Sequence, residues 1–451
     1  MFRAYDIRGI VKTDLTADFV RLIGQAIGSR ARELDIKTII VGRDGRLSGP
    51  ILAQSLTDGI LSTGTNVIDI GMVATPMLYF ATYLYQTGSG VMLTGSHNPP
   101  EYNGLKIMLG QDTLAGDQIQ SLYQRIIQNQ FKQGKGTLTH QDIQQAYKNK
   151  IIHGIHLARH LRIVIDCGNG VAGAFAGHLY RSLGAEVHEL FCEVDGHFPN
   201  HHPDPSKPEN LDSLVKTVVQ LKADIGLAFD GDGDRLGVIT SSGELIYPDR
   251  LLMLFAQDVL KRKPGSNILF DVKSTRHLFP WIRQHGGTPE MCKTGHSFIK
   301  ARMKETQAEL AGEMSGHFFF KERWYGFDDG LYAGARLLEI LSYAKNKNGF
   351  FEALPDAFST PEINMPMPEG KSAHLIETLR AQAIFPDAQN ICAIDGLRVE
   401  YTDGFGLIRA SNTTPVLVLR FEADTLSALN RIQDSFRSII KQFSPETRLT
   451  F

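Results

Sequence analysis

Three stretches of the chain repeat one order of hydrophobic and polar positions. Each begins with a short apolar run that ends in a turn, continues with apolar residues at helical spacing, and returns through a glycine to a second apolar run. The first runs and their turns lie at 38–46, 161–168 and 267–272, and the second runs at 65–70, 185–190 and 288–291. This order is typical of βαβ units, whose two strands lie parallel. The pattern therefore predicts three α/β domains with parallel or mixed sheets.

The end of the chain follows a different pattern. Residues 359–370 are rich in proline, which favours a linker or an edge strand. Helical patterns follow at 372–383 and 425–442, with strand patterns between them near 396–401, 406–410 and 416–422. The predicted fold class is therefore α/β, with three related mixed-sheet domains and a smaller C-terminal α+β domain. We expect these domains to comprise residues 1–140, 141–246, 247–356 and 357–451.

Length and composition agree with several domains in a soluble chain. A single hydrophobic core rarely extends beyond about 250–300 residues, and this chain has 451. Lys and Arg number 47 against 49 Asp and Glu, so the net charge of −2 gives no general attraction to nucleic acid or anionic membranes. The longest plain apolar stretch, 251–256, is far shorter than a membrane span. There is no apolar signal segment at the N-terminus, and the four cysteines form no CxxC pair. We therefore expect a cytoplasmic protein with reduced thiols and with neither a nucleic-acid nor a membrane partner.

The sequence Asp-Gly-Asp-Gly-Asp-Arg at 230–235 is the strongest chemical signal in the chain. It follows the apolar run 225–229, which places it at the end of a strand. Three carboxylates at alternate positions repel one another unless a cation neutralises them, and oxygen ligands suit Mg²⁺ or Ca²⁺. An EF-hand is excluded, because its sixth and twelfth positions would be Arg235 and Ser241 rather than Gly and Glu. Arg235 instead suggests that an anionic group shares the site.

A serine lies in a second candidate loop, Thr-Gly-Ser-His-Asn-Pro at 94–99, directly after the apolar run 91–93. Proline and glycine exclude a helix interior, so we expect Ser96 to be exposed at a turn after a strand. Such a serine could be a nucleophile or carry a phosphoryl group if a base or metal activates it, and it could equally cap the turn. No Gly-x-Ser-x-Gly sequence surrounds it, which argues against a hydrolase triad.

An anion-binding loop is predicted where Arg-Ala-Ser-Asn-Thr-Thr-Pro occupies 409–415. The guanidinium can bind a phosphate in bidentate fashion, and hydroxyl and backbone donors can complete its shell, although a polar turn is the plain alternative. Gly-Glu-Met-Ser-Gly-His at 312–317 can hydrogen-bond sugar hydroxyls, although a loop with a capping glutamate explains it equally well. Lys273 and the segment 293–297 give weaker signals of the same kind.

One motif favours a competing function. Gly-Asn-Gly-Val-Ala-Gly at 168–173 matches GxGxxG after a predicted strand, and Glu186 and Glu189 lie near the distance expected for a ribose-binding acid. A dinucleotide-binding dehydrogenase is therefore an alternative. Only one of the three units carries the motif, however, and nothing beside it suggests hydride transfer.

Taken in order, these motifs resemble those of the α-D-phosphohexomutase family. The similarity spans nearly the whole chain, from Phe-Arg-Ala-Tyr-Asp-Ile-Arg-Gly at 2–9 through the four loops described above. The loops at 312–317 and 409–415 are most similar to those of the bacterial bifunctional phosphomannomutase/phosphoglucomutases, whereas phosphoglucosamine mutases tend to differ in both. Gly95 stands where the wider family commonly has alanine, and we expect this change to have no effect. The resemblance implies four domains around one central cleft, with 168–173 as a βα turn without a cofactor.

The resemblance also implies an isomerase that interconverts hexose 1-phosphate and 6-phosphate. Phosphorylated Ser96 would give its phosphoryl group to the sugar, and the resulting hexose 1,6-bisphosphate, which also serves as activator, would turn over and return its other phosphate to the serine. One Mg²⁺ ion would be bound by Ser96, Asp230, Asp232 and Asp234. The candidate groups near the transfer are Arg8, Lys106, Arg235 and His317. Those expected to bind or face the substrate are Tyr5, Lys273, His296, Glu313, Ser315, Arg409, Ser411, Asn412 and Thr413.

The expected partners are thus small phosphosugars, and we expect a monomer. Ser96 and the predicted anion-binding loop at 409–415 lie far apart in the chain, so they should come from different domains. We expect the fourth domain to close over the cleft as a lid. Three alternatives stay open on the sequence: a phosphoglucosamine mutase, an NAD-binding dehydrogenase, and a protein that binds metal and sugar phosphates without catalysis.

Overall fold

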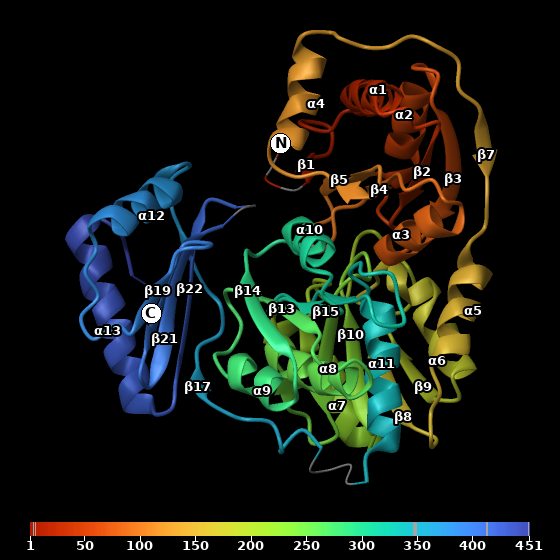
Figure 1. The fold of residues 1–451 in the computed structure, drawn as a ribbon. Helices are drawn as coiled ribbons and strands as arrows, with labels where there is room; N and C mark the ends of the chain where they lie inside the picture. The colour runs from red at the N-terminus through yellow and green to blue at the C-terminus, as the bar shows by residue number, and fades with distance from the viewer. Residues whose placement is uncertain (3, 5, 346–349, 412–413, 450) are drawn as a thin grey trace.

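The computed structural model describes residues 1–451 apart from 3, 5, 346–349, 412–413 and 450. The described strands form four sheets, and the residues of each sheet follow those of the previous one along the chain. Figure 1 shows the first unit above the second and third, and the fourth, in blue, beside the third. The predicted class of three α/β units and a C-terminal unit is confirmed.

The first sheet is mixed. Its strands lie in the order β1-β5-β4-β2-β3-β7, with β6 paired to β5. Their bounds are β1 Ile7–Ile10, β2 Thr38–Arg43, β3 Asn66–Met72, β4 Gly90–Leu93, β5 Tyr102–Leu109, β6 Asp112–Thr113 and β7 Leu138–His140. The helices of this unit are α1 Ala17–Glu33, α2 Gly49–Leu61, α3 Thr75–Leu84 and α4 Asp117–Ile127. Strand β2 is parallel to both β3 and β4, which confirms the first βαβ unit. Strand β4 ends directly before the serine loop, and the antiparallel β5 carries Lys106.

The second sheet has the order β12-β11-β10-β8-β9. Its strands are β8 Arg162–Asp166, β9 Glu186–Leu190, β10 Ile225–Phe229, β11 Leu236–Thr240 and β12 Leu245–Ile246. Its helices are α5 Gln144–Gly154, α6 Ala176–Ser182 and α7 Asp212–Leu221, with 3-10 turns η1 Val171–Ala174 and η2 Pro208–Leu211. Strand β8 is parallel to β9 and β10, so the second predicted βαβ unit is also confirmed. Strand β10 is buried along its whole length, and the aspartate loop connects it to the antiparallel β11.

The third sheet repeats this plan, in the order β14-β13-β15-β16. Its strands are β13 Asn267–Asp271, β14 Thr288–Cys292, β15 Leu310–Gly312 and β16 Phe318–Phe320. Its helices are α8 Pro248–Arg262, α9 Leu278–Gln284, α10 His296–Thr306 and α11 Gly330–Tyr343. Strand β13 is parallel to β14 and β15, which confirms the third unit. The glutamate loop at 312–317 forms the turn between β15 and the antiparallel β16.

The fourth sheet is antiparallel and has the order β17-β22-β21-β20-β19, with β18 also paired to β22. Its strands are β17 Phe358–Ser359, β18 Ile363–Pro366, β19 Asn390–Cys392, β20 Leu397–Tyr401, β21 Gly404–Ala410 and β22 Val416–Ala423. Helices α12 Lys371–Gln382 and α13 Leu426–Phe443 complete the unit. The proline-rich stretch contains the short strand β18, in agreement with the predicted edge strand. The predicted anion-binding loop at 409–415 lies between β21 and β22.

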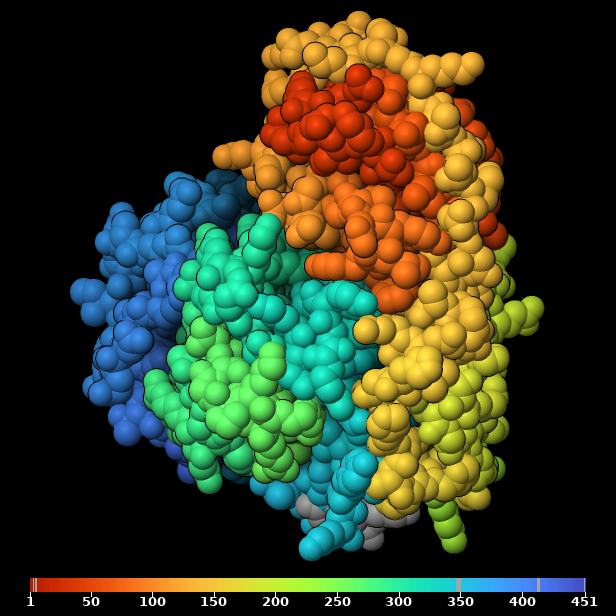
Figure 2. All heavy atoms as spheres, turned by 45° about the vertical axis from the view of Figure 1, so that its right-hand side comes forward, coloured from red at the N-terminus to blue at the C-terminus, as the bar shows by residue number. Residues whose placement is uncertain are grey.

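The apolar core is shared unequally among the units. One large cluster of buried side chains includes Met77 from α3, Phe229 from β10 and Phe318 from β16, so it joins the first three units. The fourth unit has a cluster of its own, which includes Phe421 and Phe436. In Figure 2 the fourth unit, in blue, lies against the third, in green and teal. None of the described helices combines the length and hydrophobicity that a membrane span would need.

Candidate active site

The predicted loops meet in one cleft of about 640 Å³. All four units line it: Ser96 and Lys106 come from the first, Arg235 from the second, His317 from the third and Arg409 from the fourth. The other predicted residues along it are Arg8, Lys273, His296, Glu313, Ser315 and Ser411. Tyr5, Asn412 and Thr413 lie outside the described residues. The structure thus brings together motifs that are spread over the whole chain.

Ser96 lies in a strained turn between β4 and β5. Its φ of +49° is in the left-handed region, which costs free energy for a residue other than glycine. The Ser96 hydroxyl donates to Asp230 Oδ2 at 3.0 Å and lies 3.1 Å from Nδ1 of His97. Its backbone N–H donates to the hydroxyl of Thr94 at 2.8 Å. The expectation of an exposed serine is wrong: only 2% of Ser96 is exposed, because the aspartate loop covers the turn.

The buried side chain of Arg46 fixes the shape of this turn. Its guanidinium donates at 2.6 to 2.9 Å to four backbone carbonyls, those of Ser96, Asn98, Pro99 and Tyr102. Its Nε donates to Asp44 at 3.2 Å, and the same carboxylate accepts from the hydroxyl of Thr94 at 2.7 Å. One arginine therefore ties the serine loop to the end of β2.

Gly95 leaves the space that this guanidinium occupies. A Cβ at this position would lie 2.4 Å from Cζ of Arg46, which is closer than real side-chain contacts allow. Alanine at this position would therefore require the guanidinium of Arg46 to shift. No motif singled out Arg46, because its partners are mostly backbone carbonyls that any residue supplies. Its position shortly after the buried strand β2 is the one signal that could have found it.

The three aspartates of the 230–235 loop lie fully buried beneath the cleft. One carboxylate oxygen from each lies within 4.8 Å of the other two. Lys106 donates to Asp232 at 2.7 Å and to Asp234 at 2.5 Å, and the hydroxyl of Thr75 also donates to Asp232. Asp232 Oδ1 is buried and has no hydrogen-bond partner among the described residues. Three buried carboxylates with an oxygen left unpaired form an oxygen-rich cluster that fits a divalent cation.

The charges around the cluster also favour a bound cation. Burial, together with repulsion from Asp232 and Asp234, raises the pKa of Asp230 well above its usual value. Burial acts in the same direction on Asp234, but Lys106 and His317 more than offset it and hold the pKa of Asp234 well below its usual value. The cation nearest to Asp230 is more distant, since Nε of Arg235 lies 3.8 Å from its Oδ2. A metal ion bound there would keep it ionised, as a ligand must be.

His317 connects the glutamate loop to the aspartate loop. Its Nδ1 lies 2.9 Å from Glu313 and its Nε2 lies 3.1 Å from Asp234. Burial lowers the pKa of His317, but the two carboxylates outweigh it and raise the pKa to about 9. The protonated ring donates to both of them, whereas the neutral ring can accept at Nε2 from Arg235, whose Nε lies 3.0 Å away. Glu313 also accepts the backbone N–H of Gly295 at 2.6 Å.

Two further cations of the cleft are paired with nearby carboxylates. Lys273 pairs with Glu362 at 2.8 Å, which joins the third unit to the segment before β18. Arg409 pairs with Asp395 through Nε at 3.0 Å. Its Nη2 is buried and has no hydrogen-bond partner among the described residues. Arg409 therefore keeps a donor available for an anion, beside Ser411 in the lining of the cleft.

Arg8 and His296 also line the cleft. Arg8 pairs with Asp6 at 2.6 Å and donates to the side chain of Asn98 in the serine loop. His296 begins α10 and is buried, with Nδ1 at 3.8 Å from Asp328. Burial and the nearby lysines, chiefly Lys300, lower the pKa of His296 well below its usual value. It therefore contributes a neutral ring to the cleft.

The glycine motif at 168–173 forms the turn from β8 into η1, as the resemblance implied. Its backbone is covered by neighbouring loops. A Cβ at Gly170 would lie 2.9 Å from Cα of Gly231, and one at Gly168 would lie 3.0 Å from the ring of Pro203. Since a dinucleotide needs such glycines open to its pyrophosphate, the packing argues against the dehydrogenase alternative.

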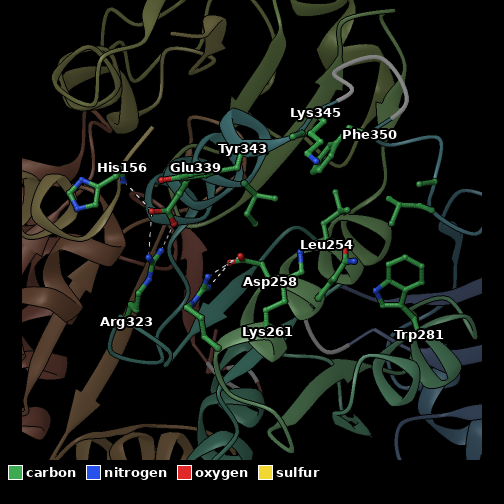
Figure 3. A pocket seen from close by; sticks show the side chains of 16 residues that line it. His156, Leu254, Asp258, Lys261, Trp281, Arg323, Glu339, Tyr343, Lys345 and Phe350 are labelled. Carbon is green, nitrogen blue, oxygen red and sulfur yellow. Dashed lines mark hydrogen bonds and ion pairs between the residues drawn. The ribbon is translucent and has the colours of Figure 1, made fainter. Parts of the chain in front are cut away.

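A second cavity, of about 670 Å³, lies between α8, α9 and α11 (Figure 3). Its charged groups pair largely with one another. Glu339 accepts from the side chain of Arg323 and from the backbone N–H of His156, and Asp258 pairs with Arg262. None of the motif residues that the structure describes lines this cavity. The candidate site is therefore the first cleft.

Comparisons with known proteins agree with this arrangement. The chain matches four domain models of phosphoglucomutase/phosphomannomutase: alpha/beta/alpha domain I at residues 1–133, domain II at 145–243, domain III at 247–356 and the C-terminal domain at 362–439. It is 60% identical over 444 residues to a phosphoglucomutase of Neisseria gonorrhoeae, covering 98% of this chain and 96% of the relative. It is 55% identical over 442 residues to a phosphomannomutase/phosphoglucomutase of Pseudomonas aeruginosa, covering 98% of this chain and 95% of the relative. The chain is also similar to a phosphoglucomutase/phosphomannomutase family protein from Burkholderia thailandensis whose crystal structure is known. The two sequences are 52% identical, and the structures superpose over 100% of this chain and 99% of the other with a TM-score of 0.95.

Proposed function

Because the chain belongs to the phosphoglucomutase/phosphomannomutase family and is a phosphohexomutase, an isomerase, we propose that it interconverts the 1- and 6-phosphates of glucose and mannose through a phosphorylated Ser96. One observation carries the role of Ser96. Its hydroxyl lies 3.0 Å from Asp230, in the same cleft whose lining also includes Arg409. A sugar that carries two phosphates needs two sites in the cleft. The serine beside the proposed cation site would serve one phosphate, and the arginine would bind the other.

The transfer itself takes two steps. The free hydroxyl of the bound hexose phosphate attacks the phosphorus of phosphoserine, the bond from phosphorus to Ser96 Oγ breaks, and a hexose 1,6-bisphosphate results. This bisphosphate turns over within the cleft, and Ser96 takes back the other phosphoryl group. Added hexose 1,6-bisphosphate would act as activator, because it can phosphorylate a resting serine.

The aspartate loop is the proposed magnesium site. Asp230, Asp232 and Asp234 would hold one Mg²⁺ together with an oxygen of phosphorylated Ser96. When bound, the ion would neutralise charge on the transferring group. Arg8, Lys106, Arg235 and His317 would add positive charge around the same group, and His317 stays protonated below about pH 9. Phosphoryl transfer depends mainly on such positioning and electrostatic stabilisation.

Other residues would hold the sugar and the phosphate that does not react. Glu313 and Ser315 face the cleft and can bind hydroxyls that glucose and mannose share. Arg409 and Ser411 would bind the remote phosphate, with Asn412 and Thr413 from the same loop. Tyr5, Lys273 and His296 would line the path between them. We take the protein to act as a monomer of four domains, 1–140, 141–246, 247–356 and 357–451, of which the fourth closes over the substrate and excludes water.

Intact-mass measurement of the purified protein tests the central claim. We expect a phosphate-sized addition after incubation with glucose 1,6-bisphosphate, and its loss in Ser96→Ala. The matched control is Ser121→Ala, at an exposed serine of α4 that bonds only to its own helix. Ser96→Ala should also abolish isomerisation while it retains binding of sugar phosphate by calorimetry. Substantial turnover by Ser96→Ala would overturn the phosphoserine role.

The choice of sugar needs a separate measurement. Turnover of glucose, mannose and glucosamine phosphates should be compared under one set of conditions, with a trace of the matching bisphosphate. We expect glucose and mannose phosphates to be used with similar kcat/KM, because the proposed sugar contacts are shared. A preference for the amino sugar would favour the phosphoglucosamine mutase alternative.

A further inference from the structure

Two cysteines lie in contact behind the aspartate loop. Cys167 directly follows β8, and Cys192 lies two residues after β9, the neighbouring parallel strand. Their Sγ atoms are 3.4 Å apart. The backbone N–H of Cys167 donates to the carbonyl of Leu190 at 3.2 Å, so the pairing of the strands holds the two thiols side by side. None of the groups invoked for the reaction includes either sulfur.

We propose that Cys167 and Cys192 form a reversible disulfide when the protein meets a peroxide, and that this disulfide slows the mutase reaction. In the first step the Cys192 thiolate attacks hydrogen peroxide. A sulfur–oxygen bond forms, the oxygen–oxygen bond breaks, and hydroxide leaves, which gives a sulfenic acid. In the second step the Cys167 thiol loses its proton as its sulfur attacks that of Cys192, the sulfur–oxygen bond breaks, and the hydroxide that leaves takes up this proton as water. Overall, two thiols and one peroxide give one disulfide and two waters.

The two thiols differ in a way that sets this order. Cys192 is half-buried and therefore accessible to a small oxidant, whereas Cys167 is fully buried. The hydrogen bond from Cys192 and burial raise the pKa of the Cys167 thiol well above its usual value. A buried thiol of that kind reacts poorly with a dissolved oxidant. It is nevertheless already in contact with the sulfur that the first step would activate.

A disulfide here would act on the catalytic loops through short contacts. The sulfur–sulfur bond is about 2.05 Å long, so the two atoms must approach each other by more than 1 Å. Cys167 begins the turn that contains Gly170, and a Cβ at Gly170 would lie 2.9 Å from Cα of Gly231. The backbone N–H of Val171 donates to the carbonyl of Gly231 at 3.1 Å. Gly231 in turn packs on the backbone of Ser96, whose carbonyl oxygen would lie 2.3 Å from a Cβ at Gly231. Movement at Cys167 can therefore reach the serine through its own turn at Gly170 and then through Gly231.

The other two cysteines provide controls within the same chain. Cys292 is buried and donates to the carbonyl of Phe270, and Cys392 is half-buried at the end of β19. Neither has another cysteine sulfur among its described partners. Cys392 thus matches Cys192 in exposure but lacks the neighbouring thiol.

The test is peroxide treatment of the full-length protein, followed by alkylation and digestion without a reductant. We expect a cross-linked peptide pair containing residues 167 and 192, lighter by two hydrogens, with kcat lowered roughly 10- to 100-fold. Dithiothreitol should reverse both changes. Cys192→Ser should keep the untreated kcat and lose the cross-link and the inhibition, whereas Cys392→Ser should behave as the wild type.

Two results would overturn the proposal. Oxidation of Cys192 to the sulfinic acid without a cross-link would show that the pair does not close. A cross-linked protein with unchanged kcat would show that closure does not reach Ser96. The mass readout does not depend on the mutase reaction, so failure of the proposed function would leave it intact and would be recognised separately by the absence of turnover in untreated protein.

Discussion

The serine side and the phosphate side of the cleft are held in different ways. Ser96 and the aspartates belong to units that share one hydrophobic core, and the buried Lys106 ties β5 directly to the aspartate loop. Arg409 belongs to the fourth unit, which has its own core. That unit contacts the third through a small apolar cluster between β21 and the end of β13, and through polar pairs around it. Arg420 pairs with Asp249 at 2.9 Å, for example.

This difference separates two tasks. The groups that we propose to surround the reacting phosphoryl group are bonded to one another, as electrostatic catalysis requires. Arg409, which we propose to bind the remote phosphate, belongs to a unit outside that shared core, as the proposed closure over the substrate requires. Substitutions on the two sides should therefore have effects of different kinds.

Among the substitutions that test this comparison, Arg46→Met should have the largest effect, because it removes the side chain that holds the serine loop. We expect kcat to fall about 100- to 1000-fold, because four backbone carbonyls lose their donor and the loop no longer holds Ser96 beside Asp230. Steady-state kinetics would measure it. Arg46→Lys should restore part of kcat, since it keeps the charge beside Asp44 but reaches fewer carbonyls. A kcat within threefold of the wild type for Arg46→Met would contradict the rigid serine side.

Arg420→Met should loosen the joint between the third and fourth units. It leaves Asp249 buried without its cation, and we expect a loss of about 2–3 kcal/mol in the stability of that joint. Differential scanning calorimetry should then show the fourth unit melting ahead of the rest. The matched control is Arg431→Met, which removes an exposed pair with Asp403 and should change little. A single, unshifted transition for Arg420→Met would mean that the joint does not depend on this pair.

Arg409→Lys should weaken the grip on the phosphate and spare the chemistry. Lysine cannot reproduce bidentate contact with a phosphate, so kcat/KM should fall about 10-fold, mostly through KM. The control is Arg380→Lys on α12 of the same unit, which bonds to backbone carbonyls outside the cleft. If kcat fell for Arg409→Lys while KM stayed constant, Arg409 would belong to the reacting end instead.

The smallest effect should be the loss of stability from the Lys273–Glu362 pair as the pH is lowered. Burial opposes ionisation of Glu362, but Lys273 outweighs it and lowers the pKa of Glu362 to about 2. A carboxylate with a lowered pKa stabilises the fold above its ordinary pKa, and this contribution is lost as the pH falls towards the lowered value. The Tm difference between the wild type and Glu362→Gln should therefore be largest near pH 6 and shrink on going to pH 3. A difference that stays constant over this range would show that the pair adds nothing to the joint.

The parts of the fold that depend on local spacing were predictable from the sequence. Strand and helix periods identified all three βαβ units, and three aspartates within five residues identified the buried acidic cluster that could hold a cation. Arg46 and Thr75 were missed, because a residue whose partners lie far along the chain leaves no local pattern. The exposure of Ser96 was misjudged for a related reason: the loop that covers it comes from another unit. Lys106 was found through the family resemblance, since one lysine within an apolar strand does not indicate its partners.

The separate core of the fourth unit has a consequence for how the protein is made. This unit comes last in the chain, and domains tend to fold in turn as they emerge during synthesis. The first three units can therefore complete their common core before β21 and β22 leave the ribosome. A nascent chain would already hold Ser96 beside the aspartates while Arg409 is still missing. Such a chain would bind sugar phosphates weakly until synthesis ends. The protein would therefore become active only when the strands of the fourth unit have been made.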